Sequence, residues 1–329
     1  MQDDGILVSF VVPVYNVEKY LNECLYSIFD TSADISQYEV IAVNDGSTDN
    51  SPAILEEYKK YDNFRVISRN NQGSSVARNT GMESARGKYI FFVDSDDYLR
   101  LAVINTTPVS IILACAATSD CDIIDFDYVN LCEETGKFVV VPTRRDLRLG
   151  VEEGRLVFPN SIRVAVWSRL FRRAFLLEHR LRFYPGIINQ DLEWTPRCFF
   201  AAEKVDYCPI PLYVYRTRPN SVMTAKIGKK ECLHPLVVAG LLAEFLDTIE
   251  PSPKNSPFRL RLKDIIFYNV RTSLRQMYRY VPICERQEIL EKLKECRHLF
   301  ALAKSTKGKL RYYLTRWLPA EIAFRIYDI

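Results

Sequence analysis

The chain has 329 residues, of which 48% are apolar and 26% are charged. These proportions are typical of a globular protein and exclude a disordered chain, a coiled-coil rod and a small disulfide-rich domain. The formal net charge of +3 does not indicate a nucleic-acid partner, although residues 251–329 alone carry 17 Lys and Arg against 7 Asp and Glu.

Short apolar runs alternate with helical patterns over the first 100 residues. Four apolar runs predict strands of the buried, parallel type, at 7–15, 38–45, 64–68 and 88–94. The segments between them predict helices at 18–30, after Pro52, and at 74–86. This β-α-β-α-β-α-β order predicts an α/β fold with a Rossmann-type, mostly parallel sheet that is flanked by helices.

The pattern changes along the rest of the chain. We expect a fifth strand at 121–129, a hairpin edge strand at 137–142, helices near 172–180 and 191–202, and an extended strand at 206–216. From residue 228 onward only helices are predicted, at 229–249, 257–280, 284–300 and 307–317. The sequence therefore predicts an α/β domain over 1–225 and a helical C-terminal region over 226–329.

Nine cysteines are present without a Cys-x-x-Cys pair, and there are only three histidines. This composition predicts reduced, buried thiols and lacks the parts of a zinc site or a Ser-His-Asp triad. The N-terminus has no basic and apolar leader, and the longest apolar runs reach about half of the ~20 residues that span a bilayer. We therefore expect a cytoplasmic protein that does not cross a membrane.

Polar motifs follow three of the predicted parallel strands, at the strand ends where open α/β sheets bind ligands. They lie at 13–16 (PVYN), 44–49 (NDGSTD) and 94–97 (DSDD). The second also fits an ordinary turn before a helix, with Asp49 as the N-cap. In the third, three carboxylates fall within four positions, and their mutual repulsion costs energy unless a cation neutralises them. Mg²⁺ or Mn²⁺ that bridges a diphosphate is the preferred interpretation, and a solvated acidic turn is the alternative.

A polar loop that contains glycine, residues 69–79, follows the third strand and opens the next helix. Its backbone N–H groups and the side chain of Arg78 are suited to a nucleotide phosphate. A surface ion pair is an equally good interpretation of Arg78 by itself.

Residues 6–100 carry these motifs in a distinctive order, as VSFVVPVYNVEKYLNECLYSI, VIAVNDGSTDNS and NNQGSSVARNTGMESARGKYIFFVDSDDYL. They resemble the nucleotide-sugar-binding half of the inverting family 2 glycosyltransferases of the GT-A fold. The resemblance implies a GT-A domain over 1–225, with a donor half at 6–100 and an acceptor and catalytic half at 101–225. It also implies a nucleoside diphosphate sugar donor, a UDP-sugar in the first place, and a divalent cation, Mn²⁺ or Mg²⁺.

The same resemblance implies site residues in the donor half. The side chains expected to contact the nucleobase and ribose are Pro13, Tyr15 and Asp45. Asp94 and Asp96 match the family's Asp-x-Asp pair, which holds the metal and the diphosphate, with Asp96 as the direct metal ligand. Asp97 matches the acidic position that follows and is expected to face the donor sugar.

An inverting transferase also needs a base that removes the proton of the acceptor hydroxyl as this hydroxyl attacks the sugar. In the family, an acidic pair that opens a helix after the sheet supplies it, and this chain has NQDLEW at 189–194. Asp191 aligns with the base, Gln190 replaces the usual Glu, and Glu193 is the reserve candidate. The alternative for Asp191 is a simple helix N-cap.

Two further segments fit the resemblance. Residues 165–170 resemble the family's W-x-K-L segment, so Trp167 is expected to stack on an acceptor sugar, with Arg169 at the Lys position. A core position is the alternative for Trp167. Residues 215–223 resemble the segment that folds over the donor diphosphate, where either Arg216 or Arg218 is expected to offset the charge of the leaving group.

The helix expected at 307–317 has an apolar face made of Leu310, Tyr313, Leu314 and Trp317, with basic side chains around it. This pattern suits a helix that lies on an anionic membrane surface, so residues 304–329 are expected to contact the inner face of the cell membrane, where polyprenyl-linked acceptors reside. Packing of the apolar face onto the α/β domain is the alternative.

Together these expectations describe a metal-dependent inverting glycosyltransferase. It would move a sugar from a UDP-sugar to a hydroxyl of a glycan or lipid-linked glycan in surface polysaccharide biosynthesis, by single displacement. Gln190 keeps open an alternative, a catalytically impaired protein that binds nucleotide sugar or glycan. A Mg²⁺ phosphohydrolase is disfavoured, because its Asp-x-Asp motif follows the first strand and here the motif follows the fourth.

Overall fold

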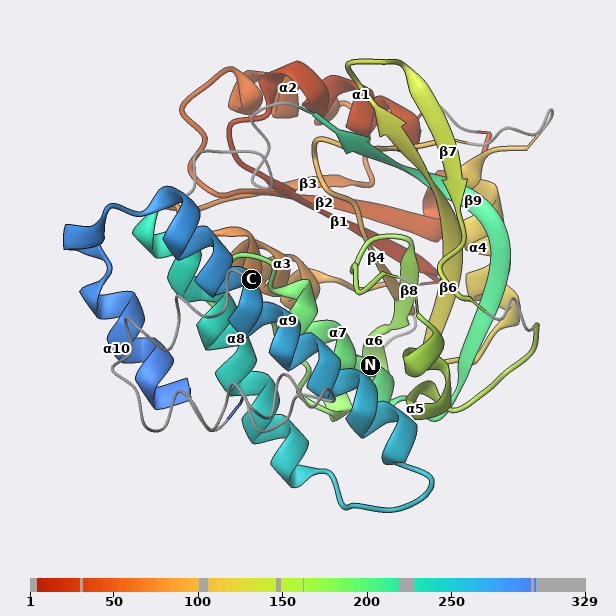
Figure 1. The fold of residues 1–329 in the computed structure, drawn as a ribbon. Helices are drawn as coiled ribbons and strands as arrows, with labels where there is room; N and C mark the ends of the chain where they lie inside the picture. Colours follow the sequence, from red (N-terminus) through yellow and green to blue (C-terminus); the bar gives the residue numbers. More distant parts are fainter. Residues whose placement is uncertain are drawn as a thin grey trace. The chain divides into compact units, whose positions relative to one another are not determined.

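A computed structural model gives the arrangement of the chain (Figure 1). The structure describes residues 5–29, 32–100, 106–145, 149–161, 163–218, 228–296 and 299. The chain divides into two compact units, which are described separately. The sheet unit comprises residues 1–186 and 197–219, and the helical unit comprises residues 187–196 and 220–329.

The first four strands of the sheet unit form a parallel sheet in the order β3-β2-β1-β4. Their bounds are β1 (Val8–Val14), β2 (Tyr38–Asn44), β3 (Phe64–Ser68) and β4 (Tyr89–Phe92). The register places Val8 opposite both Tyr38 and Tyr89. β1 and β2 are buried along nearly their whole length, which explains their continuous apolar sequence. All four strands confirm the sequence prediction.

Helices cover both faces of this parallel sheet (Figure 1). They are α1 (Glu18–Phe29), α2 (Ser51–Tyr58), α3 (Ser74–Ser84) and α4 (Pro108–Thr118). Apolar side chains of α1, α2 and α4 join Phe10, Tyr38 and Phe91 in one buried cluster. α3 packs on β1 and β2, and Gly81 permits a close approach because a Cβ at this position would lie 2.3 Å from a methyl carbon of Val11.

The sheet continues beyond β4 in the order β8-β6-β9-β5, and β7 pairs with β6. The bounds are β5 (Tyr98–Leu99), β6 (Ile123–Cys132), β7 (Lys137–Val141), β8 (Arg169–Arg172) and β9 (Val205–Thr217). β8 runs antiparallel to both of its neighbours, whereas β6 and β9 are parallel to each other. The predicted α/β class, with a mostly parallel sheet flanked by helices, is confirmed, and the antiparallel additions curl the sheet.

Short helical segments complete the sheet unit. They are η1 (Ile35–Gln37), α5 (Gly154–Val157), η2 (Phe158–Asn160) and α6 (Arg173–Glu178). The next helix, α7 (Asp191–Ala201), begins in the helical unit and ends in the sheet unit. The segment 187–196, which the sequence analysis placed in the catalytic half of the α/β domain, therefore packs with the C-terminal helices.

The helical unit is built around two long helices, α8 (Lys229–Thr248) and α9 (Ser256–Tyr280), followed by η3 (Ile283–Glu285) and α10 (Gln287–Glu295). α8 and α9 lie side by side, and the Ser273 hydroxyl of α9 donates to the Cys232 carbonyl of α8 at 2.6 Å. The predicted helical C-terminal region is confirmed over these residues. The helix expected at 307–317, and the membrane contact expected for 304–329, lie outside the described residues. No helix in the described ranges combines the length and apolarity needed to cross a bilayer.

Candidate active site

Hydrogen bonds join the loops after β1 and β2 at the carboxyl edge of the parallel sheet. The Oδ1 atom of Asn16 accepts a hydrogen bond from the Thr48 N–H at 2.8 Å, and the Ser47 hydroxyl oxygen accepts one from the Asn16 N–H at 3.2 Å. Gly46 adopts a φ of +77°, and a Cβ there would lie 2.9 Å from the backbone nitrogen of Asn71. The NDGSTD motif is thus a tight turn that also touches the loop before α3.

Asp45 fixes the loop before α3 through its buried carboxylate. This carboxylate accepts hydrogen bonds from the N–H groups of Gln72, at 3.1 Å, and Gly73, at 2.7 Å, and pairs with Arg69 at 3.2 Å. Tyr15, at the end of β1, is 48% exposed. The structure therefore leaves the Tyr15 ring open to a ligand and gives Asp45 a role in shaping the loop.

Pro13 also belongs to this edge of the sheet. It lies in β1 opposite Val43 of β2 and is only partly buried. The carboxyl ends of β1, β2 and β4 meet at one edge because the three strands are parallel, so the three predicted motifs fall at the same edge.

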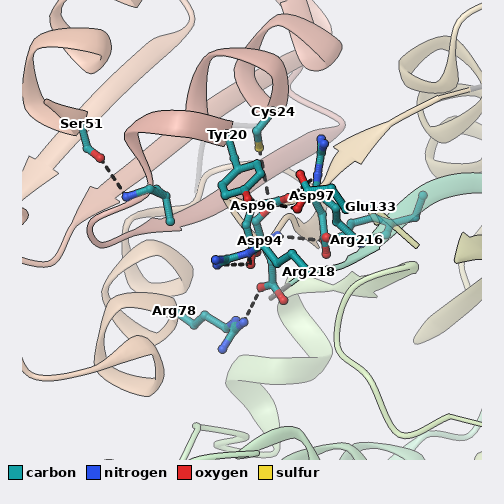
Figure 2. Close-up of polar contacts among 12 residues, drawn as sticks. Tyr20, Cys24, Ser51, Arg78, Asp94, Asp96, Asp97, Glu133, Arg216 and Arg218 are labelled. Atoms are coloured by element: carbon teal, nitrogen blue, oxygen red, sulfur yellow. Dashed lines mark hydrogen bonds and ion pairs between the residues drawn. The ribbon is translucent and has the colours of Figure 1, made fainter. Parts of the chain in front are cut away.

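The acidic turn, residues 94–97, follows β4 and is paired with arginines from distant parts of the chain (Figure 2). Arg78 of α3 binds the Asp94 carboxylate. Arg218, directly after β9, donates to Oδ2 of Asp96 from Nε at 3.0 Å and from Nη2 at 2.7 Å. The sequence analysis required a cation to offset the repulsion in this turn, and guanidinium groups supply that positive charge here.

Asp97 is 1% exposed and serves as an internal support of the acidic turn. Its Oδ2 accepts the Tyr213 hydroxyl at 2.7 Å, and its Oδ1 accepts the N–H of Arg216 at 2.8 Å. Burial raises the pKa of Asp97 well above its usual range, and the charges of Asp96 and Asp94 raise it further. This burial corrects the expectation that Asp97 faces the donor sugar: the side chain instead holds the turn against β9.

Asp94 and Arg78 form a partly desolvated pair. Burial raises the pKa of Asp94, the neighbouring Asp96 charge adds to this increase, and Arg78 opposes it. Arg78 is 5% exposed, and within the described part of the chain its Nε and Nη1 atoms are buried without a hydrogen-bond partner. Buried donors without acceptors are costly, so the Arg78 guanidinium has unused capacity for an anion at this position.

Tyr20 and Glu23 of α1 complete the cluster. The Tyr20 ring lies 4.8 Å from the guanidinium carbon of Arg218 and 5.2 Å from that of Arg216, which are cation–π distances. Glu23 accepts from Nη2 of Arg216 at 2.8 Å, and the carbonyl of Asp96 accepts from its Nε at 2.9 Å. Sequence reasoning did not identify Tyr20 or Glu23, although their spacing of three on an amphipathic helix, next to a candidate site, was a usable signal.

The donor set of the acidic turn fits a hard divalent cation. Mg²⁺ usually takes one or two protein carboxylates and completes its coordination with water and phosphate oxygens. Asp94 and Asp96 offer such carboxylates, each of them shared with one arginine. No group of three or more His, Cys, Asp and Glu side chains suited to a metal occurs among the described residues, so a cation here needs further oxygens from a ligand.

Trp167 lies in the interior of the sheet unit. It is 4% exposed, and its ring stacks on Tyr213 and Tyr215 at centroid distances of 4.7 and 5.1 Å with interplanar angles of 11°. The Arg163 guanidinium lies 4.8 Å from the Tyr215 ring centre. The core position is therefore correct for Trp167, and stacking on an acceptor sugar is not supported.

Arg169 is fully buried and belongs to an ion-pair network instead of an acceptor site. Its Nε donates to Oδ1 of Asp125 at 2.7 Å, while Nε of Arg144 donates to Oδ2 of the same carboxylate at 3.0 Å. Arg169 also donates to the backbone carbonyls of Arg163, at 3.0 Å, and Ala165. The expected contact with an acceptor is corrected, because no face of the Arg169 side chain reaches solvent.

Replacing Asp125 with asparagine is expected to destabilise the protein by about 3–5 kcal/mol, because two buried guanidinium groups then lose the charge that offsets them. Urea denaturation followed by circular dichroism measures this loss. Asp62→Asn is the matched control, since Asp62 is exposed, and it is expected to change stability by less than about 0.5 kcal/mol. Equal denaturation midpoints for the two variants would contradict this account of Arg169.

Asp191 is the first residue of α7, at the helix start that the sequence predicted. Its side chain is partly exposed, and its Oδ1 accepts the Leu192 N–H at 3.0 Å. Gln190 is 8% exposed, and its carbonyl accepts the N–H of Trp194 at 2.9 Å. Glu193, the reserve candidate, is 5% exposed. Of the two carboxylates, Asp191 is therefore the more accessible to a substrate.

Comparison with known proteins gives one consistent family. Residues 9–104 match the family model described as Glycosyl transferase family 2. EpsH of Bacillus subtilis (strain 168), a glycosyltransferase by name, is 36% identical over 222 residues, which cover 66% of this chain and 62% of EpsH. GlyG of Streptococcus pneumoniae serotype 4, also a glycosyltransferase by name, is 32% identical over 228 residues, which cover 66% of this chain and 73% of GlyG. The match thus spans less than two thirds of the length of EpsH.

A solved structure shows the same fold over nearly the whole chain. Staphylococcus aureus TarS 1–349, in a crystal structure with UDP-GlcNAc, superposes with a TM-score of 0.72 at 19% sequence identity. The superposition covers 98% of this chain and 90% of that chain. At this level of identity the likeness establishes a shared fold.

Proposed function

Because this chain belongs to glycosyltransferase family 2, we propose that it transfers a sugar from a nucleoside diphosphate sugar to a hydroxyl group of a glycan acceptor. One observation carries the proposal. The acidic turn after β4 meets Arg78 and Arg218 at the carboxyl edge of a parallel sheet, where the loops after β1 and β2 also end. Carboxylates beside guanidinium groups, of which Arg78 has unused donors, suit a diphosphate and its cation.

A UDP-sugar is the donor that we propose. The complex of the structural neighbour TarS with UDP-GlcNAc supports this choice, since the two chains share their fold. Tyr15 presents an exposed ring at the end of β1, beside Pro13 and the Asp45 turn, and a flat ring is suited to a nucleobase. The residues assigned to the nucleoside are accordingly Pro13, Tyr15 and Asp45.

Arg78 and Arg218 are assigned to the diphosphate. The unpartnered Nε and Nη1 donors of Arg78 can bind phosphate oxygens without giving up its bond to Asp94. Both arginines are held in the structure, but Arg216 is held by Glu23 and by the Asp96 carbonyl, whereas Arg218 is held by the Asp96 carboxylate, which the proposed cation would take. Between the two arginines that the sequence left open, the geometry thus favours Arg218. When bound by Asp96 and Asp94, Mn²⁺ or Mg²⁺ would neutralise the charge that develops on the leaving diphosphate.

Asp191 is assigned as the general base of an inverting single displacement. The acceptor oxygen forms a bond to the anomeric carbon while the bond from this carbon to the diphosphate breaks. The nucleoside diphosphate leaves with the electron pair of that bond, and the proton of the acceptor hydroxyl passes to the Asp191 carboxylate. Gln190, an amide where the family has an acid, accepts no proton, so a single carboxylate performs this step.

The acceptor that we propose is a glycan or lipid-linked glycan of a surface polysaccharide. The polymer-modifying relatives support this class: one is named poly(ribitol-phosphate) beta-glucosyltransferase, from Bacillus spizizenii, and is 47% identical over 95 residues. Contact of residues 304–329 with an anionic membrane would bring the enzyme to a polyprenyl-linked acceptor, and the basic composition of this tail supports it.

A thermal-shift screen of nucleotide sugars with and without Mn²⁺ tests the proposed donor. A ligand present at 100 times its Kd stabilises the native state by about 2.7 kcal/mol, which raises the Tm by about 5 °C. We expect this increase for UDP-GlcNAc or another UDP-sugar with Mn²⁺, and a smaller one after chelation by EDTA. ATP serves as the control nucleotide. If no sugar nucleotide raises the Tm in the presence of either cation, the proposed function is wrong.

A further inference from the structure

His234 of α8 holds the segment that leads into Asp191. The backbone N–H of Ile188 donates to Nδ1 of His234 at 3.2 Å, across 46 positions of the sequence. Ile188 and His234 both belong to the helical unit. The bond therefore ties the start of the segment 187–191 to the C-terminal helices, three residues before Asp191.

The backbone turns between Ile188 and the first turn of α7. Asn189 adopts a φ of +55°, in the left-handed region, and its carbonyl accepts the Leu192 N–H at 3.0 Å. The helical hydrogen bonds of α7 start only at the carbonyl of Gln190. The bond to His234 fixes the peptide N–H of Ile188 before this turn, and the first hydrogen bonds of α7 fix the carbonyl of Gln190 after it.

His234 itself sits on a well-anchored part of α8. The carbonyl of Cys232, two positions earlier, accepts the Ser273 hydroxyl of α9 at 2.6 Å, and Cys232 and Ser273 are fully buried. Burial lowers the pKa of the His234 imidazole, and the nearby charge of Lys230 lowers it further, whereas Glu231 opposes this decrease. A neutral imidazole that accepts the Ile188 N–H at Nδ1 carries its proton on Nε2.

We propose that His234 is a positioning residue for the general base, which places Asp191 by accepting the Ile188 N–H. This inference rests on the proposed function, in which Asp191 takes the acceptor proton. A displacement of about 1 Å at a reacting group can lower a rate by about 100-fold. The C-terminal helices would thus affect catalysis by fixing the backbone of residues 187–191, which carries Asp191. The binding of the donor would not depend on His234.

Substitutions at His234 that differ only in where they present an acceptor test the proposal. In His234→Asn the amide oxygen lies at the same distance along the side chain as Nδ1, so we expect kcat within about threefold of wild type. His234→Gln places its oxygen one carbon farther out, and His234→Leu has none, so both are expected to lower kcat by about 10–100-fold. The Kd of UDP with Mn²⁺, measured by calorimetry, is expected to stay within twofold in all three variants.

Two comparisons separate the possible failures. His179→Leu, the same change at an exposed histidine of the sheet unit, is expected to leave kcat unchanged. If Asp191→Asn is inactive and folded His234→Gln keeps the kcat of His234→Asn, the inference about His234 is overturned while the proposed function stands. Equal losses of kcat and UDP affinity would also overturn it, since they indicate general damage. If Asp191→Asn turns over normally, the proposed base itself is wrong.

Discussion

Replacing Asp191 with asparagine is expected to lower the rate of sugar transfer by about 10²–10⁴-fold, the range that a general base contributes. Asparagine has nearly the same shape as aspartate, and its oxygen can still accept the Leu192 N–H that Oδ1 binds now. It cannot take up the proton of the acceptor hydroxyl at neutral pH. UDP binding in the presence of Mn²⁺ is expected to be unchanged, so the variant separates chemistry from donor binding. Initial rates and calorimetry on the same preparation measure the two quantities.

Glu193→Gln is the control for this variant, because Glu193 is the other carboxylate in the first turn of α7. The low exposure of Glu193 predicts that this change affects stability more than the transfer rate. Normal turnover by Asp191→Asn together with a large loss in Glu193→Gln would move the base to Glu193. If Asp191 only stabilises the helix start, Asp191→Asn would transfer sugar at the normal rate and unfold at nearly the wild-type temperature, since asparagine caps a helix about as well as aspartate.

The parallel half of the fold could be predicted because its strands are buried on both faces. A strand such as β1 or β2 then has a continuous apolar sequence, which stands out against the amphipathic helices between the strands. β5 and β8 have two and four residues, and such short strands are defined by the partners they pair with more than by their own sequence. α4 was not predicted, because a helix with apolar residues on most of its surface shows little helical period.

The sequence predicted which types of residue belong to the candidate site, but not which of the residues form ion pairs with one another. The strand-end rule placed the acidic turn correctly, since it depends only on the order of strands. The partner of Asp96 is Arg218, which is 122 positions away. The pattern of residues 215–223 narrowed the choice to Arg216 and Arg218, but it does not say which of the two pairs with Asp96. Arg169 is a second case of a partner that is distant in the sequence. It stands at a position where the family commonly has a lysine, which suggested contact with an acceptor, but it pairs with Asp125, 44 positions earlier.

Trp167 and Asp97 show a second limit, which concerns burial. Both match family positions next to a substrate, and both are nearly inaccessible to solvent in this chain. Tyr213 explains both cases, because its ring stacks on Trp167 and its hydroxyl donates to Asp97. The sequence around a tyrosine in a long strand does not indicate which distant side chains it will contact, and here they are Trp167 and Asp97.

Asp96 has two competing partners in the proposed reaction, and this competition makes its removal informative. In the structure its Oδ2 accepts two hydrogen bonds from Arg218. In the proposed donor complex the same carboxylate binds a divalent cation, and Arg218 turns to the diphosphate. A cation that binds Oδ2 of Asp96 takes the oxygen that now accepts both hydrogen bonds of Arg218, so donor and cation should bind together and displace Arg218 as they do so.

Asp96→Ala is therefore expected to abolish transfer and to raise the Kd of UDP with Mn²⁺ by more than about 100-fold, or about 2.7 kcal/mol. Calorimetric titrations of UDP, with Mn²⁺ and with EDTA, measure how far binding depends on the cation. Wild type should show a large difference between the two titrations and Asp96→Ala almost none. If Asp96 serves only as the partner of Arg218, the variant would keep the full Mn²⁺ dependence and lose stability instead. That result would show that Asp96 is not a ligand of the cation and would leave Asp94 as the remaining candidate in the acidic turn.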